Sequence, residues 1–362
     1  MTTTQDILEP SGAAASWARL QLKNSDQAHR ITLIPGEGIG PEITAAATRA
    51  VDATGVSVVW QTVALNSRSI AASGGNIPPA IFDVLRKNRV ALKGPVSEQS
   101  PKAPRTARAA LRERLGLFIN YRPIRSIPGV ASLLPNVPVD IAIFQENQEG
   151  LYSGIGQLAA LGVVEDLGFV ARTISLRIAD AAFAFARREG RRRVTAVHHG
   201  FDANEMLFLN CCRETARSLR HIQYDELLAD EAARLIPEHP DKFDVILAPS
   251  HFGDRLADLC SFLVGGVTLL PTADLGEAYA VFSSLQRSSP DSTRGDSVNP
   301  TGSIQAAALL LEHIGEKDAA LRLRRALCAV YADGRHLTPD VGGNASTSEF
   351  TNAVVAELGP PG

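Results

Sequence analysis

The sequence has few of the residues that would place it in a specialised class of protein. Among its 362 residues are two tryptophans, two methionines and four cysteines, and aromatic residues make up 6%. The cysteines are Cys211, Cys212, Cys260 and Cys328; they lack metal-site spacing, and the adjacent pair cannot easily form a bridge. This pattern predicts reduced thiols and a cytoplasmic location.

An excess of one charge and long apolar runs are also missing. The formal net charge is -3, which gives no support to a nucleic acid or a membrane surface as partner. No segment resembles a secretory signal or a membrane span, and there is no internal repeat or low-complexity linker. The remaining composition, 45% hydrophobic and 21% charged, predicts a globular protein of one or two domains.

The most informative stretch covers residues 243–258. Its apolar run, residues 245–248, predicts a buried strand, and after a turn at Gly253 a helix is expected. Asp254 and Asp258 would then lie one turn apart on one side of that helix. Such carboxylates can hold a divalent cation, or they can simply suit the positive end of the helix dipole. These two residues alone leave both interpretations open.

Apolar runs alternate with amphipathic segments along the chain, which predicts an α/β fold. The expected strands are residues 31–34, 56–63, 90–92, 117–120, 139–144, 194–197 and 245–248, with a strand or a crossing between domains at 264–271. The expected helices are 42–51, 79–86, 105–114, 174–188, 206–220, one ending before Pro237, 301–314, 319–331 and 346–358. Residues 1–28 are expected to be a loosely ordered leader, 153–172 an arm or hairpin, and 283–297 a loop.

Arginines accompany two of these elements. Arg112 lies on the expected basic helix and Arg122 at a strand end, positions suited to binding a ligand with several carboxylates. For Arg105 and Arg114 the pattern favours a solvated helix face. The glycine-rich segment 35–41 is weak support for a dinucleotide site, because its glycines are not spaced as in the Rossmann fingerprint.

A series of motifs runs along the chain in a characteristic order. They are residues 34–42, 92–95, 111–112, 122–123, 146–147, 149–154, 252–258, 298–300 and 340–343. Together they resemble the motifs of the β-decarboxylating dehydrogenases, the isocitrate and 3-isopropylmalate dehydrogenase family. The resemblance covers about residues 30–358, nearly the whole expected globular part.

The resemblance implies an isopropylmalate dehydrogenase-like fold, an open α/β sheet in two domains with the active site in the cleft between them. Residues 29–117 plus 265–362 would form a large domain holding both chain ends. Residues 118–264 would form an inserted dimerisation domain, with an arm near 153–172. The implied assembly is a homodimer, or a heteromer with an active paralogue.

The family oxidises a 2-hydroxy acid with NAD or NADP and then releases carbon dioxide, with Mg²⁺ or Mn²⁺ polarising the hydroxyl oxygen. The implied metal ligands are Asp254, Asp258 and, from a second subunit, Asp230. Tyr152 matches the residue that protonates the enolate carbon. The implied substrate is a small carboxylate, bound by arginines that include Arg112 and Arg122.

The residues that depart from the family pattern are ones expected to take part in catalysis and in cofactor binding. Gln145 stands where a third substrate-binding arginine is expected, and His199 where a lysine would act as base. In the adenosine loop, Arg287 replaces a glycine that a nucleotide approaches closely. Asn299 and Asp340 remain as cofactor-binding candidates. These changes predict weakened or lost binding of NAD or NADP.

Three functions are compatible with this pattern. We weigh first a divergent metal-dependent enzyme acting on a small 2-hydroxy or 2-oxo polycarboxylate, which includes one that only decarboxylates or isomerises. Next is a non-catalytic subunit that pairs with an active paralogue. The third is an orthodox NAD-dependent β-decarboxylating dehydrogenase with tolerated substitutions.

Overall fold

The structure is a computed structural model that describes most of the chain. The described residues are 28–96, 106–134, 137–148, 156–160, 163–166, 168, 170–200, 202–287 and 295–359. The predicted leader up to residue 27, Arg105 and Tyr152 lie outside them.

Twelve strands are present in the described part of the chain. They are β1 (His29–Ile34), β2 (Val58–Thr62), β3 (Val90–Lys93), β4 (Ile119–Arg125), β5 (Asp140–Glu146), β6 (Gly156–Ala160), β7 (Val163–Asp166), β8 (Arg193–His198), β9 (Gln223–Leu228), β10 (Val245–Ala248), β11 (Pro271–Leu275) and β12 (Ala280–Ser284).

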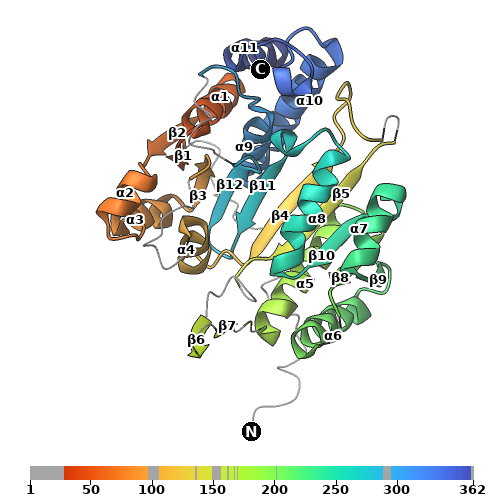
Figure 1. Cartoon of the computed structure of the whole chain (residues 1–362). Helices are drawn as coiled ribbons and strands as arrows, with labels where there is room; N and C mark the ends of the chain where they lie inside the picture. Colours follow the sequence, from red (N-terminus) through yellow and green to blue (C-terminus); the bar gives the residue numbers. More distant parts are fainter. Residues whose placement is uncertain are drawn as a thin grey trace.

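The same described residues form eleven α-helices (Figure 1). They are α1 (Gly40–Ala53), α2 (Ser67–Ala72), α3 (Pro79–Asn88), α4 (Ala107–Arg114), α5 (Arg172–Arg188), α6 (Ala203–Ser218), α7 (Ala229–Glu238), α8 (Ser250–Phe262), α9 (Thr301–His313), α10 (Lys317–Asp333) and α11 (Thr347–Leu358).

Ten of the strands form a single mixed sheet in the order β2-β1-β3-β12-β11-β4-β5-β10-β8-β9. The four strands at one end are mutually parallel, and so are the four at the other end. Between them, β11 and β4 pair antiparallel with their neighbours. The predicted α/β fold with a large open sheet is confirmed (Figure 1).

One face of the sheet is covered by a continuous apolar core. Alternate residues of the strands, such as Leu92, Phe144 and Val194, point into it and pack against α1, α5, α6, α9, α10 and α11. This face holds the largest of the three buried clusters, which explains why the long amphipathic helices were predictable from their apolar stripes.

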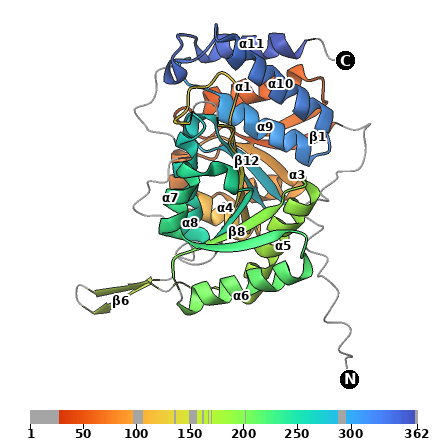
Figure 2. The same ribbon diagram turned by 90° about the vertical axis from the view of Figure 1, so that its right-hand side faces the viewer.

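The opposite face carries two separate apolar clusters. One lies under α7 and α8 and includes Ile141, Ile143 and Ile246; the other lies under α3 and α4 and includes Ala91 and Val281. Figure 2 shows α7 and α8 on the side of the sheet away from α5. The strip of sheet between the two clusters is where polar side chains are buried.

The segment after α8 differs from the prediction. Of the two predictions for residues 264–271, the strand is wrong, because Gly265 and Gly266 have φ of 104° and 119°, which breaks an extended run, and the crossing between domains stays a prediction. The hairpin β11–β12 follows instead, and it takes residues 283 and 284 out of the predicted loop. These strands were not predicted from the sequence, because they are short and carry polar residues on one face.

Two helix boundaries also differ. α8 begins at Ser250, so Gly253 lies inside the helix rather than in a turn before it. A β-carbon at Gly253 would lie 2.4 Å from Cγ of Gln145, so the glycine allows the helix to approach the sheet. α7 continues through Pro237 to Glu238, two residues past the predicted end. The short helix α2 was not predicted.

The expected hairpin within 153–172 is present as β6 paired antiparallel with β7, and it projects from the body of the molecule (Figure 2). All four cysteines are free, as predicted. Within the described residues, no helix is both long enough and apolar enough to cross a bilayer. The division into domains at 117/118 and 264/265 stays a prediction.

Candidate functional site

A band of buried polar side chains crosses the sheet between the two clusters on its second face. On β4, Asn120 and Arg122 alternate with residues that face the other core. The register partners of Asn120 are Asp274 on β11 and Gln145 on β5. Because side chains of paired strands at the same register share a face, the topology brings these groups together.

Asp274 is the centre of this band. Its Oδ1 accepts hydrogen bonds from Asn120 (2.7 Å), Asn147 (2.8 Å) and Arg112 (3.1 Å). Burial would raise the pKa of Asp274, but Arg112, Arg108 and the two amides outweigh it and lower the pKa to about 2. The carboxylate is therefore ionised and holds Arg112, a predicted substrate-binding residue, in place.

Arg122 is the second predicted substrate-binding arginine, and its side chain is only 1% exposed. It donates to the carbonyl oxygen of Gly253 at 3.1 Å and forms a short ion pair with Asp254. Both contacts lie near the start of α8. The structure thus joins a predicted substrate-binding arginine to a predicted metal ligand.

Gln145 occupies the same end of α8. Its Nε2 donates to the carbonyl oxygen of Ser250 at 2.6 Å, and its side chain lies against Gly253. Its Oε1 is buried and has no hydrogen-bond partner in the described structure. A buried acceptor without a partner costs about 1–3 kcal/mol, so the glutamine is not placed there for stability alone.

The other catalytic candidates lie at the surface. The ring of His199 is exposed and stacks on Phe252, with ring centres 5.4 Å apart. The backbone N–H of His199 donates to Glu205 at 3.2 Å, which fixes the turn after β8. Asp230 is exposed near the start of α7. That Asp230 serves a second subunit stays a prediction.

Two of the three predicted metal ligands lie on the same helix. Asp254 and Asp258 both lie on α8, and their carboxylate oxygens suit Mg²⁺ or Mn²⁺. Over the described residues, no three His, Cys, Asp or Glu side chains are grouped closely enough to hold a metal ion. The described residues therefore offer two carboxylates of suitable chemistry on one helix, and the metal site itself stays a prediction.

Arg287 lies close to one of these carboxylates. Its Nη2 is 4.0 Å from Oδ2 of Asp258, and its side chain is 84% exposed. An exposed pair at this distance contributes little to stability. It does place the cation of the altered adenosine loop beside a predicted metal ligand, which the sequence did not indicate.

The two cofactor-binding candidates are in contact. Nδ2 of Asn299 donates to Asp340 and to the hydroxyl of Tyr331, each at 3.1 Å. Thr268 also donates to Asp340, at 2.8 Å. Gln286 is buried and donates to the backbone carbonyl of Asn299 at 3.0 Å. These hydrogen bonds hold the segments around Asn299 and Asp340 together. A cofactor bound here would contact a surface that is already formed.

The loop is also anchored by a residue that the sequence did not single out. Glu42, in the first turn of α1, accepts from the backbone N–H groups of Asp296, Ser297 and Val298 at 3.0 to 3.1 Å. It also accepts from the hydroxyl of Thr347. The carboxylate thus ties the segment before Asn299 to the glycine-rich loop that opens α1.

That glycine-rich loop packs directly on the segment after β3. A β-carbon at Gly36 would lie 2.0 Å from the carbonyl oxygen of Pro95, and one at Gly94 would lie 2.2 Å from that of Pro35. Gly36 also has a φ of 74°. Only glycine fits, so the predicted tight turn over residues 35–41 is confirmed.

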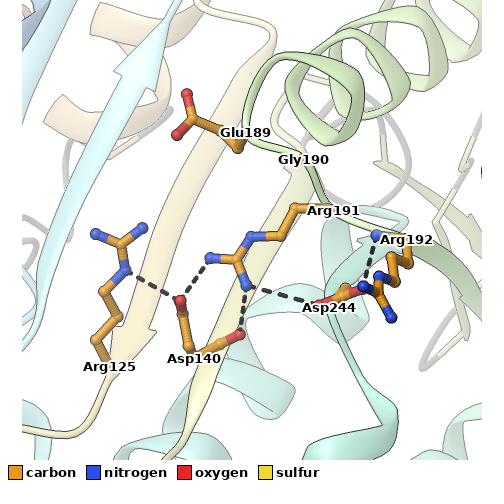
Figure 3. Close-up of a pocket in the computed structure, with 7 residues that line it drawn as sticks. All are labelled: Arg125, Asp140, Glu189, Gly190, Arg191, Arg192 and Asp244. Carbon is orange, nitrogen blue, oxygen red and sulfur yellow. Dashed lines mark hydrogen bonds and ion pairs between the residues drawn. The ribbon is translucent and has the colours of Figure 1, made fainter.

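A charged pocket lies at the other end of the sheet, at the start of β5, β8 and β10 (Figure 3). Its volume is about 400 Å³, and the cations Arg125, Arg191 and Arg192 lie there beside the anions Asp140, Glu189 and Asp244. Asp140 accepts from Arg125 at 3.0 Å and from Arg191 at 2.6 Å. The pocket's charges neutralise each other, and no predicted site residue lines it.

The protein has an α/β fold with one large mixed sheet. Guanidinium and carboxylate groups are buried on this sheet, beside the glycine-rich loop and the segment before Asn299 that Glu42 anchors. The family model for isocitrate/isopropylmalate dehydrogenase matches residues 30–354. The chain belongs to this family, and the resemblance inferred from the motifs is confirmed.

Relatives found by sequence and by structure agree with this family assignment. A probable isocitrate dehydrogenase [NAD] subunit alpha, mitochondrial, of Drosophila melanogaster is 36% identical over 91% of this chain and 87% of its own. The human isocitrate dehydrogenase [NAD] subunit alpha, mitochondrial, is 37% identical over 90% of this chain and 89% of its own. The crystal structure of isocitrate dehydrogenase from Methylococcus capsulatus superposes with a TM-score of 0.87 at 36% identity, covering 91% and 99% of the two chains.

These relatives correct one prediction. The expected cytoplasmic location is wrong, because the named relatives are mitochondrial subunits. Unpaired cysteines indicate that thiols stay reduced, and they do not identify a compartment.

Proposed function

We propose that the chain is a metal-dependent enzyme that acts on a small 2-hydroxy or 2-oxo polycarboxylate, by a chemistry derived from the oxidative decarboxylation of isocitrate-type acids. The observation that carries the proposal is the buried pair of arginines, Arg112 and Arg122, each aligned by a carboxylate. Maintaining two buried guanidinium groups costs desolvation energy, which an anionic ligand can offset.

The roles follow from position. Arg112 and Arg122 bind and orient the substrate carboxylates, and Gln145 adds a neutral amide at the same place. Asp254 and Asp258 would hold Mg²⁺ or Mn²⁺ with Asp230 of a second copy, and the metal would supply Lewis acidity at the substrate oxygen. His199 would accept a proton from the substrate, and Tyr152 would donate one to the enolate carbon.

Thermal unfolding with Mn²⁺ and with NAD tests the proposal, since a ligand that binds only the folded chain raises its melting temperature. We expect Mn²⁺ together with isocitrate to raise it by several degrees, and NAD to raise it little. EDTA should abolish the first shift and leave the apoprotein's melting temperature unchanged. The absence of any shift with metal and polycarboxylate would refute the proposal and favour a non-catalytic subunit.

A second candidate, the orthodox NAD-dependent dehydrogenase, is supported by 36–37% identity to NAD-dependent subunits over nine-tenths of the chain. For this function, formation of NADH from isocitrate, followed by its absorbance, is the direct measurement. A shift with both Mn²⁺ and NAD, accompanied by NADH, would establish it in place of the first.

The double variant Gln145→Arg with His199→Lys restores the two cations that the family pattern predicts. It should raise the rate of NADH formation by about tenfold or more, because a charge-assisted contact to a carboxylate is worth roughly 1.5–3 kcal/mol. His221→Lys is the matched control, since it adds a cation at an exposed position outside the site. If the folded double variant gains no more than the control, the altered loop at Arg287 is the limiting change.

The assembly is part of the proposal. A site completed by Asp230 of another chain requires a dimer, either of identical chains or with an active relative. The named relatives are subunits, which supports a heteromer. Light scattering of the purified chain separates the two, because a chain that stays monomeric alone needs a different partner.

A further inference from the structure

The segment after β12 brings a positive charge to α8. Arg287 lies just after β12, which ends at Ser284, and its Nη2 is 4.0 Å from Oδ2 of Asp258. Asp258 is one turn along α8 from Asp254, so the two carboxylates lie on the same side of the helix. One of the two predicted metal carboxylates on α8 is therefore already close to a cation of the same chain.

The backbone that carries Arg287 is fixed at the two preceding residues. The backbone N–H of Leu285 donates to the carbonyl oxygen of Leu270 at 2.9 Å, and its side chain packs against the apolar cluster under α7 and α8. Gln286 is buried and donates to the carbonyl oxygen of Asn299 at 3.0 Å. The guanidinium of Arg287 therefore extends from a fixed point beside α8.

Both members of the pair are accessible to solvent. The side chain of Arg287 is 84% exposed and that of Asp258 is 49% exposed. The pair can separate without leaving a buried charge unpaired, and an exposed pair of this kind contributes little to stability. A ligand with a stronger attraction for the Asp258 carboxylate can therefore displace Arg287.

A divalent cation is a ligand of this kind. Asp carboxylates are common ligands of Mg²⁺ and Mn²⁺ in proteins. A guanidinium repels a cation of charge two about twice as strongly as it repels one of charge one at the same distance. Arg287 therefore opposes the metal in two ways, because it attracts a carboxylate that the metal needs and it repels the metal itself.

We propose that Arg287 competes with a divalent cation for Asp258 and so sets the affinity of the chain for that cation. This inference rests on the proposed function, in which Asp254 and Asp258 hold the metal, and it names a residue that regulates the same site. Because the pair is weak, Arg287 lowers the metal affinity without abolishing binding.

Titration calorimetry of the full chain with Mn²⁺ tests this inference through a series of charges at one position. Arg287→Gln should bind Mn²⁺ about three- to tenfold more tightly than the unaltered chain, and Arg287→Glu more tightly still. Arg287→Lys keeps the charge and should stay within about twofold of the unaltered chain. Arg335→Gln is the matched control, since it removes an exposed cation that pairs with Asp333 instead, and it should leave the affinity unchanged.

The salt dependence of the same titration is a second measurement. Raising NaCl from about 0.05 M to about 0.5 M should shrink the difference in Mn²⁺ affinity between Arg287→Gln and the unaltered chain, because salt screens exposed charges. A difference that is independent of salt would contradict competition by charge, because a change in the shape of the segment would then explain it.

The outcomes separate this inference from the proposed function. If the unaltered chain binds Mn²⁺ and Arg287→Gln binds it equally tightly, the inference is wrong and the proposed function stands. Equal gains in Arg287→Gln and Arg335→Gln also refute it, because the change would then reflect only the net charge of the chain. If neither the unaltered chain nor any Arg287 variant binds Mn²⁺, the proposed function itself fails.

Discussion

Replacing Asp274 with alanine is expected to destabilise the folded chain by about 3–5 kcal/mol, because it removes one partner of a buried ion pair. Arg112, whose side chain is 5% exposed, would keep its charge without a counter-ion. The amides of Asn120 and Asn147 would also lose their shared acceptor. Chemical denaturation followed by circular dichroism measures the change.

Asp333→Ala is the control for this prediction. Asp333 also pairs with an arginine, Arg335 at 2.7 Å, but that arginine is 77% exposed. Its removal should leave the free energy of unfolding nearly unchanged, because solvent screens an exposed pair. Equal losses for the two variants would show that Asp274 does not hold the buried network together.

The pKa of Asp274 predicts how the stability difference between the unaltered chain and Asp274→Ala depends on pH. The folded-state pKa of about 2 lies below that of the unfolded chain, near 3.9. The carboxylate therefore stabilises the fold above about pH 3.9, and this stabilisation is lost as the pH falls towards 2. The difference between the unaltered chain and Asp274→Ala should be largest at neutral pH and shrink below pH 4.

A second large effect is expected from acidification to pH 4, and it depends on His313. The ring lies against Phe282 with ring centres 5.3 Å apart, and its Nε2 is buried without a partner in the described structure. Burial lowers the pKa of His313 to about 4, from 6.5. Between these values the unfolded chain binds a proton that the folded chain does not, so stability falls as the pH falls.

The size of this effect follows from the shift, which corresponds to up to about 3 kcal/mol between pH 6.5 and pH 4. His313→Leu should flatten the dependence of the unfolding free energy on pH over that interval. His336→Leu, at an exposed position, should leave the slope unchanged. An unaltered slope in His313→Leu would mean that other groups carry the pH dependence in this window. The interval is distinct from that of Asp274, so the two contributions can be measured separately.

The sequence predicted the elements that have strong periodic or apolar patterns. The strands at β1, β3, β5, β8 and β10 are short apolar runs between turn residues, and their places were found. The hairpin β11–β12 was missed because its second face is polar; Asp274 and Thr272 point away from the core. Local pattern cannot show that a polar residue becomes buried through strand pairing.

The candidate site was predictable only in part. Arg112, Arg122 and Asp254 came from motifs, and the structure places them within one cluster. Asp274 and Glu42 were missed, because their role depends on partners far away in the chain. One signal was available: Asn120 and Arg122 alternate with apolar residues on β4, which predicts a polar band on one face of a strand. Tyr152 lies outside the described residues, so its role stays a proposal.

The hairpin β11–β12 has a consequence for how the chain is made. β3 and β4 are not paired with each other; β12 and β11 lie between them and pair with each in turn. β3 ends at Lys93 and β12 begins at Ala280. Nearly two hundred residues must therefore be synthesised before β3 can pair with its second neighbour. Until then the nascent polypeptide exposes unpaired strand edges, which invite aggregation. The sheet can therefore close only after Ser284 has been synthesised and has emerged from the ribosome.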